Sequence, residues 1–65
     1  MTEVKMFKGG IYSAISETYE NLDKDINKYA KEKDLYIKSI HYDRLNDVII
    51  ANVLFSDIPS EMFVL

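Results

Sequence analysis

Apolar residues recur in the first half of the chain with the period of an α-helix. Most positions on this stripe are three or four residues apart: Tyr19, Leu22, Ile26, Tyr29 and Ala30. Such a stripe is typical of a helix that packs one side on a core. Ser16 is a suitable N-cap residue, so the pattern predicts a helix from about Glu17 to about Lys33 that covers one face of a sheet.

Two segments after the predicted helix are rich in β-branched and aromatic residues. They run from Leu35 to Tyr42 and from Val48 to Phe55, and the polar segment from Asp43 to Asp47 separates them. This pattern predicts an antiparallel hairpin with a polar turn. Pro59 then ends the second strand, because proline cannot donate to the ladder of hydrogen bonds.

The N-terminal segment allows two interpretations. Val4 to Phe7 alternate as in a strand, and Gly9-Gly10 follow. We favour a hairpin turn, or a glycine bulge, at the two glycines; alternatively, the glycines end the strand and a loop leads to the helix. The sequence therefore predicts one α+β domain over residues 1–65, a small antiparallel sheet with one amphipathic helix on one face, in the order β(β)αββ.

The last predicted strand is apolar on both faces. One face carries Ile49, Ala51, Val53 and Phe55, and the other carries Val48, Ile50, Asn52 and Leu54. A sheet with one face in water should alternate apolar and polar residues. One helix covers only one face, so the other face needs the apolar tail from Met62 to Leu65, a second copy of the chain, or a foreign partner.

The strand before it does not alternate cleanly. Leu35, Ile37, Ser39 and His41 fall on one side, whereas Tyr36, Lys38, Ile40 and Tyr42 fall on the other. A β-bulge near Ser39 would bring Ile37 and Ile40 to the same face.

Length and composition favour association with another chain. A domain of 65 residues buries little surface, and the chain has no Cys and only one His, so neither disulfides nor a thiolate metal site can stabilise it. The net charge of −3 argues against nucleic acid. No apolar run is long enough to span a membrane, and no signal peptide is evident, so we expect a cytoplasmic protein.

We therefore expect a homodimer or a larger homo-oligomer. Exposed tyrosines are common interface anchors, and an apolar chain end is unusual for a monomer. The expected partner-binding residues come from the sheet and the tail: Tyr36, Tyr42, Val48, Ile50, Leu54, Met62, Phe63 and Leu65.

Candidate chemistry is sparse, and we expect no enzyme, no metal and no cofactor. His41 is the only side chain of moderate pKa and lacks a nucleophile motif. Asp43, Asn46 and Asp47 are typical turn residues without the spacing of a calcium loop. The alternative to a protein-interaction module is a nucleotide-like ligand bound between subunits by four polar residues: His41, Tyr42, Arg44 and Asn52.

Three segments share features with a known group of small proteins. They are Leu22 to Tyr29, which contains an Ile-Asn pair, Ile37 to Tyr42, which ends in Ile-His-Tyr, and Ile50 to Phe55, which contains Ala-Asn-Val. Over about half of its length the chain thereby resembles the small Cse-type sporulation proteins and related short phage proteins. The resemblance brings no catalytic residues, and it implies a phage-encoded inhibitor of a host enzyme or defence complex.

Overall fold

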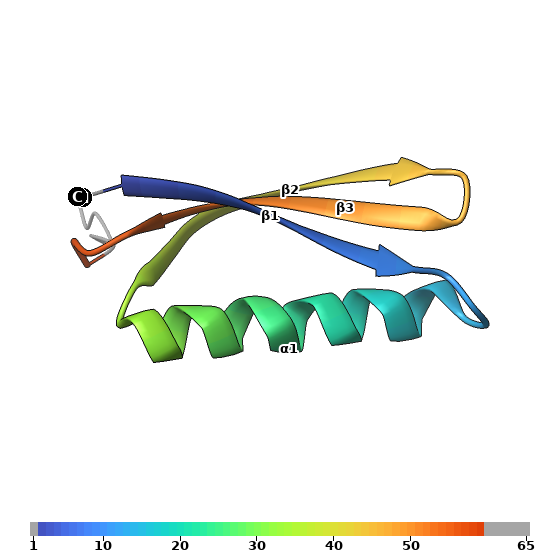
Figure 1. Cartoon of the computed structure of the whole chain (residues 1–65), viewed down its shortest axis with the longest axis horizontal. Coiled ribbons are helices and arrows are strands. Elements are labelled where there is room, and N and C mark those ends of the chain that lie inside the picture. Colours follow the sequence, from blue (N-terminus) through green and yellow to red (C-terminus); the bar gives the residue numbers. More distant parts are fainter. Residues whose placement is uncertain (1, 60–65) are drawn as a thin grey trace, which may run out of the picture.

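The computed structural model describes residues 2–59 and contains four elements. These are β1 (Thr2–Gly10), α1 (Ile15–Lys33), β2 (Tyr36–Leu45) and β3 (Val48–Ser56). The strands form an antiparallel sheet in the order β1-β3-β2, so the last strand lies in the centre. Helix α1 runs along one face of this sheet, and no described element lies on the other face (Figure 1). The predicted α+β fold is confirmed.

The favoured hairpin at Gly9-Gly10 is wrong, because both glycines belong to β1. Gly9 pairs with Ile49 and Gly10 with Val48, without a break in register and without a positive φ. A Cβ atom on Gly9 would lie 3.0 Å from Thr18 Cγ2. The small residue is therefore explained by the close approach of α1 to β1.

Helix α1 begins two residues earlier than predicted. Its N-cap is Ala14, which has no side-chain hydrogen bond to offer, so the assignment of Ser16 as N-cap is wrong. The Glu17 N–H donates to the Ala14 carbonyl instead. The hydroxyl of Thr18 donates to the Gly10 carbonyl at 3.1 Å, which ties the first turns of α1 to the end of β1.

The predicted end of the helix at Lys33 is confirmed, and it has a physical cause. Asp34 adopts the left-handed conformation, with φ of 57°. The N–H of Leu35 then donates to the Ala30 carbonyl at 2.8 Å. This C-cap turns the chain back toward the sheet and brings Leu35 against the core.

The core lies between α1 and the inner face of β3. The helix contributes Leu22, Ile26 and Ala30 from the predicted stripe, and β3 contributes its predicted inner face: Ile49, Ala51, Val53 and Phe55. All seven are nearly inaccessible to solvent. The two outer strands add Phe7 and Ile37, which pack against this core.

Strand β2 contains the predicted bulge. Ile37 pairs with Phe55 and Ser39 with Leu54, so the register shifts between them and Lys38 is the additional residue. As expected, Ile37 comes to the same face as Ile40, against the core.

The turn between β2 and β3 is shorter than predicted. Strand β2 continues through Asp43 to Leu45, which pairs with Val48 and leaves a two-residue turn. The polar residues of this segment predict a five-residue turn, but within it Asn46 alone has the positive φ, 54°, that a tight turn requires. Within residues 2–59, no helix is long and apolar enough to cross a membrane.

Candidate interaction surface

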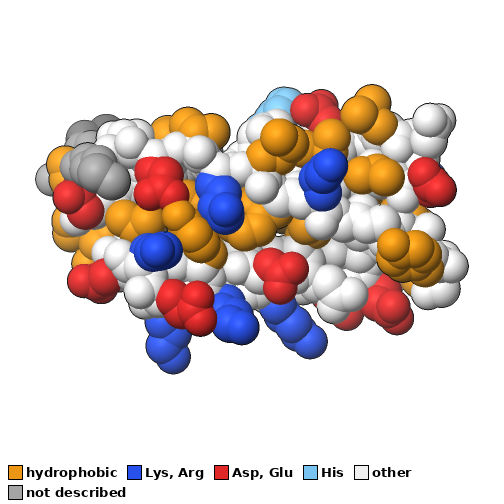
Figure 2. Space-filling view, in the orientation of Figure 1, with side chains coloured by type: hydrophobic (Ala, Val, Ile, Leu, Met, Phe, Trp, Pro, Cys, Tyr) orange, Lys and Arg blue, Asp and Glu red, His pale blue; other side chains and the backbone are white. Residues whose placement is uncertain are grey.

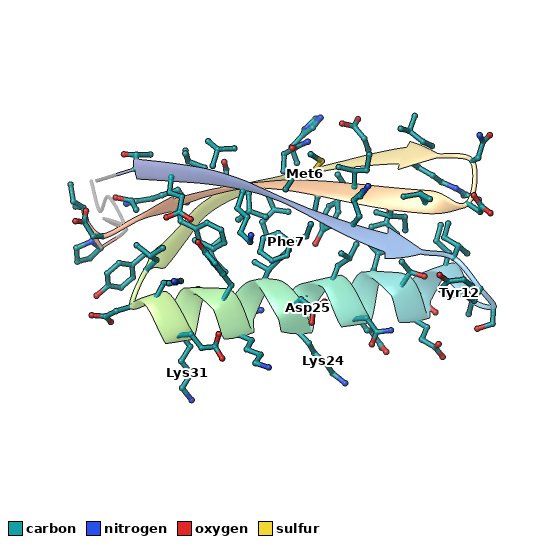
Figure 3. All side chains as sticks on the ribbon, in the orientation of Figure 1. Met6, Phe7, Tyr12, Lys24, Asp25 and Lys31 are labelled. Carbon is teal, nitrogen blue, oxygen red and sulfur yellow. The ribbon has the colours of Figure 1, made fainter. Side chains whose placement is uncertain are left out.

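We call the side of the sheet opposite α1 the uncovered face. The register arranges its residues in five rows across β1, β3 and β2: Thr2, Ser56 and Tyr36; Val4, Leu54 and Ser39; Met6, Asn52 and His41; Lys8, Ile50 and Asp43; and Gly10, Val48 and Leu45. In Figure 3, Met6 points away from the helix, whereas its neighbour Phe7 points toward it. This is the alternation that a strand imposes on successive side chains.

The uncovered face is largely apolar and open to solvent. Val4 is 69% exposed, Met6 56% and Leu45 58%. The central residues of β3 on this face are half-buried by their neighbours within the sheet. Figure 2 shows hydrophobic side chains reaching the surface along the sheet, while lysines project from the helix side. Contiguous apolar surface of this kind typically marks an interaction site.

Charges on the uncovered face lie at its two edges. Lys8 and Asp43 flank Ile50 in one row, Lys8 on β1 and Asp43 on β2. His41 Nε2 lies 3.7 Å from Asp43 Oδ1, and both side chains are mostly exposed. The centre of the face is therefore apolar apart from Asn52, and its polar groups form a rim, as in typical protein interfaces.

The structure separates the predicted partner-binding residues into three groups. Val48, Ile50 and Leu54 lie on the uncovered face. Tyr36, which is 46% exposed, belongs to the same face, in the row of Ser56 at the end of the sheet. Three further predicted residues, Met62, Phe63 and Leu65, lie outside the described residues.

Tyr42 lies on the helix side of the sheet. It pairs with Ala51, and its ring packs edge-on against Tyr19 of α1 with 5.1 Å between ring centroids. Burial raises the pKa of Tyr42, and the nearby Asp23 and Tyr19 raise it further. This tyrosine is therefore remote from the uncovered face.

Sequence reasoning missed Val4, Met6 and Leu45 as residues of this surface. The alternation of Val4 and Met6 with Lys5 and Phe7 was a usable signal. It did not reveal that β1 pairs with the last strand of the chain, because that pairing is not a local property of the sequence.

The four residues of the alternative ligand site do not lie together. His41 and Asn52 are paired neighbours on the uncovered face. Tyr42 and Arg44 point to the helix side, where Arg44 Nε donates to the carbonyl of Asn46 at 3.3 Å. A ligand on one face of the sheet would not contact all four.

A hollow of about 150 Å³ lies between the end of β1 and the start of α1. Its lining comes from these two elements and their connection: Lys8, Gly9, Gly10, Tyr12, Glu17, Thr18, Asn21, Leu22 and Asp25. This volume is below the roughly 300–1,000 Å³ of typical ligand pockets. In the described part of the chain, no group of three or more His, Asp or Glu residues is placed to hold a metal ion.

The free edges of the sheet are poorly suited to accept another strand. On β2 the bulge at Lys38 interrupts the ladder, and Asp43 and Arg44 add charge. On β1 the edge carries Lys5 and Lys8. Bulges and lysines are the usual protection of edge strands, so the uncovered face is the better candidate surface.

Comparison of the chain with known protein families, curated proteins and solved structures finds no match. The resemblance to the Cse-type sporulation proteins and short phage proteins therefore stays a hypothesis. The candidate surface rests on the geometry of the chain itself.

Proposed function

We propose that this chain is a non-enzymatic protein-interaction module that acts as a homo-oligomer through its uncovered face. The observation that carries this proposal is the exposure of large apolar side chains in register across the sheet, with Val4 at 69% and Met6 at 56%. A soluble domain gains by covering such a surface, because each fully buried side chain of this size contributes about 1.5–3 kcal/mol.

The small size of the domain makes this gain important. A chain of 65 residues with one helix on one face of a sheet has a single thin core. Domains of this size are only marginally stable and often depend on disulfides, metals or association. Association through the uncovered face adds a second apolar layer to β3, which is the strand with the most buried residues.

A foreign target is compatible with the same surface. The resemblance to short phage proteins suggests inhibition of a host enzyme or defence complex in the cytoplasm, and a target would then compete with self-association for the uncovered face. The alternative of a nucleotide-like ligand is less favoured, because His41 and Asn52 lie on a different side of the sheet from Tyr42 and Arg44. Thermal stabilisation by nucleotides would support that alternative.

Sedimentation equilibrium tests the proposal from about 10 μM to about 1 mM, where weak contacts of modest area associate. We expect the wild-type mass to rise with concentration and the Ile50→Lys variant to stay monomeric. Glu32→Gln is the control, because it makes the same change in net charge on the exposed side of α1. A monomeric wild type throughout would contradict the proposal.

The same measurement on a chain truncated after Ser60 separates the sheet from the tail. We expect the truncated chain to associate like the full chain, because the uncovered face is intact. Loss of association on truncation would assign the contact to residues 61–65 and overturn the role of the uncovered face.

A further inference from the structure

The pattern of side chains on the uncovered face is complementary to itself in one particular orientation. We propose that two copies pack face to face about a two-fold axis parallel to β3, with reciprocal Lys8–Asp43 ion pairs across the interface. This arrangement rests on the proposed function, and it names the partner and the residues that fix its orientation.

The symmetry determines which strands meet. Rotation by a half turn about an axis parallel to β3, lying between the two copies, places β3 over β3 and β1 over β2 of the second copy. Each row of the uncovered face then meets the same row of the second copy in reverse order. Aligned sheets pack in this way about 10 Å apart, with their side chains interdigitated.

The charges of the face match in this orientation. Lys8 lies on β1 and Asp43 on β2 in the same row, so Lys8 of each copy faces Asp43 of the other. Ile50 lies between them and meets its own equivalent at the axis. Opposite charges therefore meet twice at the rim around an apolar centre, which is the pattern that sets orientation in interfaces.

Apolar side chains also meet in another row, whose two ends are Gly10 and Leu45. The ring of Tyr12 lies against Gly10, and it is 95% exposed. Leu45, which is 58% exposed, would pack against this ring in the second copy. In the Met6 row, Asn52 meets its own equivalent, and two amide groups can each donate and accept a hydrogen bond. The one polar group in the centre thereby acquires a partner.

A two-fold axis across the strands would match less well. Centred on Asn52, it would place β1 over β1 of the second copy and exchange the two rows on either side. Lys8 would then lie over Val4, and Asp43 over Ser39. A lysine covered by apolar surface without a counter-charge is unfavourable, so the axis parallel to β3 is preferred.

The area indicates how strong such a dimer is. Three strands spaced about 4.8 Å apart, each about nine residues long, present a flat area of roughly 400 Å² per copy. The pair would bury on the order of 800 Å², which is less than the roughly 1,200–2,000 Å² of stable complexes. The dimer should therefore exchange subunits readily, which makes a mixing experiment practical.

A charge-swap experiment tests the orientation. Lys8→Glu places two like-charged pairs at the rim, and so does Asp43→Lys, so each variant should self-associate about ten-fold more weakly than wild type. When the two variants are mixed, both pairs become attractive again. Native mass spectrometry, which separates the three possible dimers by mass, should then show the heterodimer in large excess over both homodimers.

Matched variants control for net charge. Lys24→Glu and Glu32→Lys make the same charge changes on α1, where Lys24 projects away from the sheet (Figure 3). Their mixture should form dimers in statistical proportions. Lys8 and Asp43 are exposed, so the circular dichroism spectra of their variants should match that of wild type.

The outcomes distinguish this arrangement from the proposed function. If wild type associates and Ile50→Lys prevents it, but the charge-swap mixture gives statistical proportions, the orientation is wrong and the proposed function stands. If wild type stays monomeric at every concentration, both are overturned.

Discussion

Gly9 and Leu22 lie so close together that a Cβ atom on Gly9 would be 3.2 Å from Leu22 Cγ. The same atom would be 3.0 Å from Thr18 Cγ2. Leu22 is 2% exposed and Thr18 donates its hydroxyl to the Gly10 carbonyl, so neither side chain is free to move away. The approach of α1 to β1 therefore depends on the missing side chain at this position.

We expect Gly9→Ala to destabilise the fold by about 1–2 kcal/mol. Overpacking a close contact typically costs about 1–3 kcal/mol. Alanine loses less conformational entropy than glycine on folding, which offsets roughly 0.5–1 kcal/mol of this cost. Urea unfolding followed by circular dichroism, at one fixed protein concentration, measures the change.

Gly10→Ala is the matched control for this prediction. A Cβ atom on Gly10 would lie 2.9 Å from the ring of Tyr12, but that side chain is 95% exposed and can turn into solvent. In dilute protein, where copies do not associate, the stability of Gly10→Ala should stay within about 0.5 kcal/mol of wild type. Equal losses in the two variants would show that strand geometry, rather than contact with α1, requires the glycines.

Periodic segments were predictable from the sequence, whereas the ends of elements were less so. The stripe through Leu22 and Ile26 identified the buried side of α1, because burial along a helix follows its period. The local rule that paired glycines form a turn fails at Gly9-Gly10, because Gly9 allows a close approach to Thr18 and Leu22 of α1, which are distant in sequence. The chemistry of Ser16 favours it as N-cap, but the N-cap of α1 is Ala14.

The candidate surface was predictable where it lies on β3. The sequence predicts an apolar outward face at Val48 and Ile50 correctly, because β3 pairs without a bulge and its successive side chains point to opposite faces throughout. On β2 the bulge reverses the alternation, and this reversal places Tyr42 with Ile40 on the helix side. The sequence predicts the bulge, but placing Tyr42 with Val48 and Ile50 ignores the reversal that the bulge causes, so this placement is wrong.

The hydroxyl of Tyr29 donates a hydrogen bond to the Glu3 carboxylate, which joins α1 to the start of β1. This bond raises the pKa of Tyr29, and partial burial and the negative charge of Glu3 raise it further. The ring of Tyr29 also packs on Phe7 and Phe55, with ring centroids 5.9 Å and 5.1 Å away.

Stability should therefore fall as the pH rises above about 10. The folded state holds the Tyr29 proton more tightly than the unfolded state, whose tyrosine pKa is about 10. The stabilisation is complete below that value and is lost as the pH rises through the higher pKa of the folded state. Urea midpoints measured between about pH 8 and about pH 11 should decrease for wild type.

Tyr29→Phe should reduce this pH dependence, because it removes the ionising group and keeps the ring. A smaller decrease should remain, because the pKa of Tyr42 is raised in the same direction. Tyr12→Phe is the control, since Tyr12 is almost fully exposed. If Tyr29→Phe and wild type lose stability in parallel, the bond to Glu3 does not contribute to the alkaline transition.

Ile49 and Ile50 are neighbours on β3 whose side chains point to opposite faces of the sheet. Substitutions at these two positions therefore distinguish an effect on folding from an effect on association. Ile49 is fully buried beneath α1. Ile49→Ala should cost about 2–5 kcal/mol, because it leaves a cavity in the core. This loss should be the same at every protein concentration, since the inner face takes no part in contact between copies.

Ile50→Ala should behave differently because Ile50 is only half-buried within one copy. In dilute protein the substitution should cost about 1 kcal/mol, from the apolar contacts within the sheet. At concentrations where wild type associates, the deficit should grow, because association stabilises only the folded chain that still binds its partner. Thermal unfolding at concentrations about 100-fold apart would measure both the loss of stability within one copy and the additional deficit where wild type associates. A deficit for Ile50→Ala that is independent of concentration would show that the uncovered face does not bind a second copy.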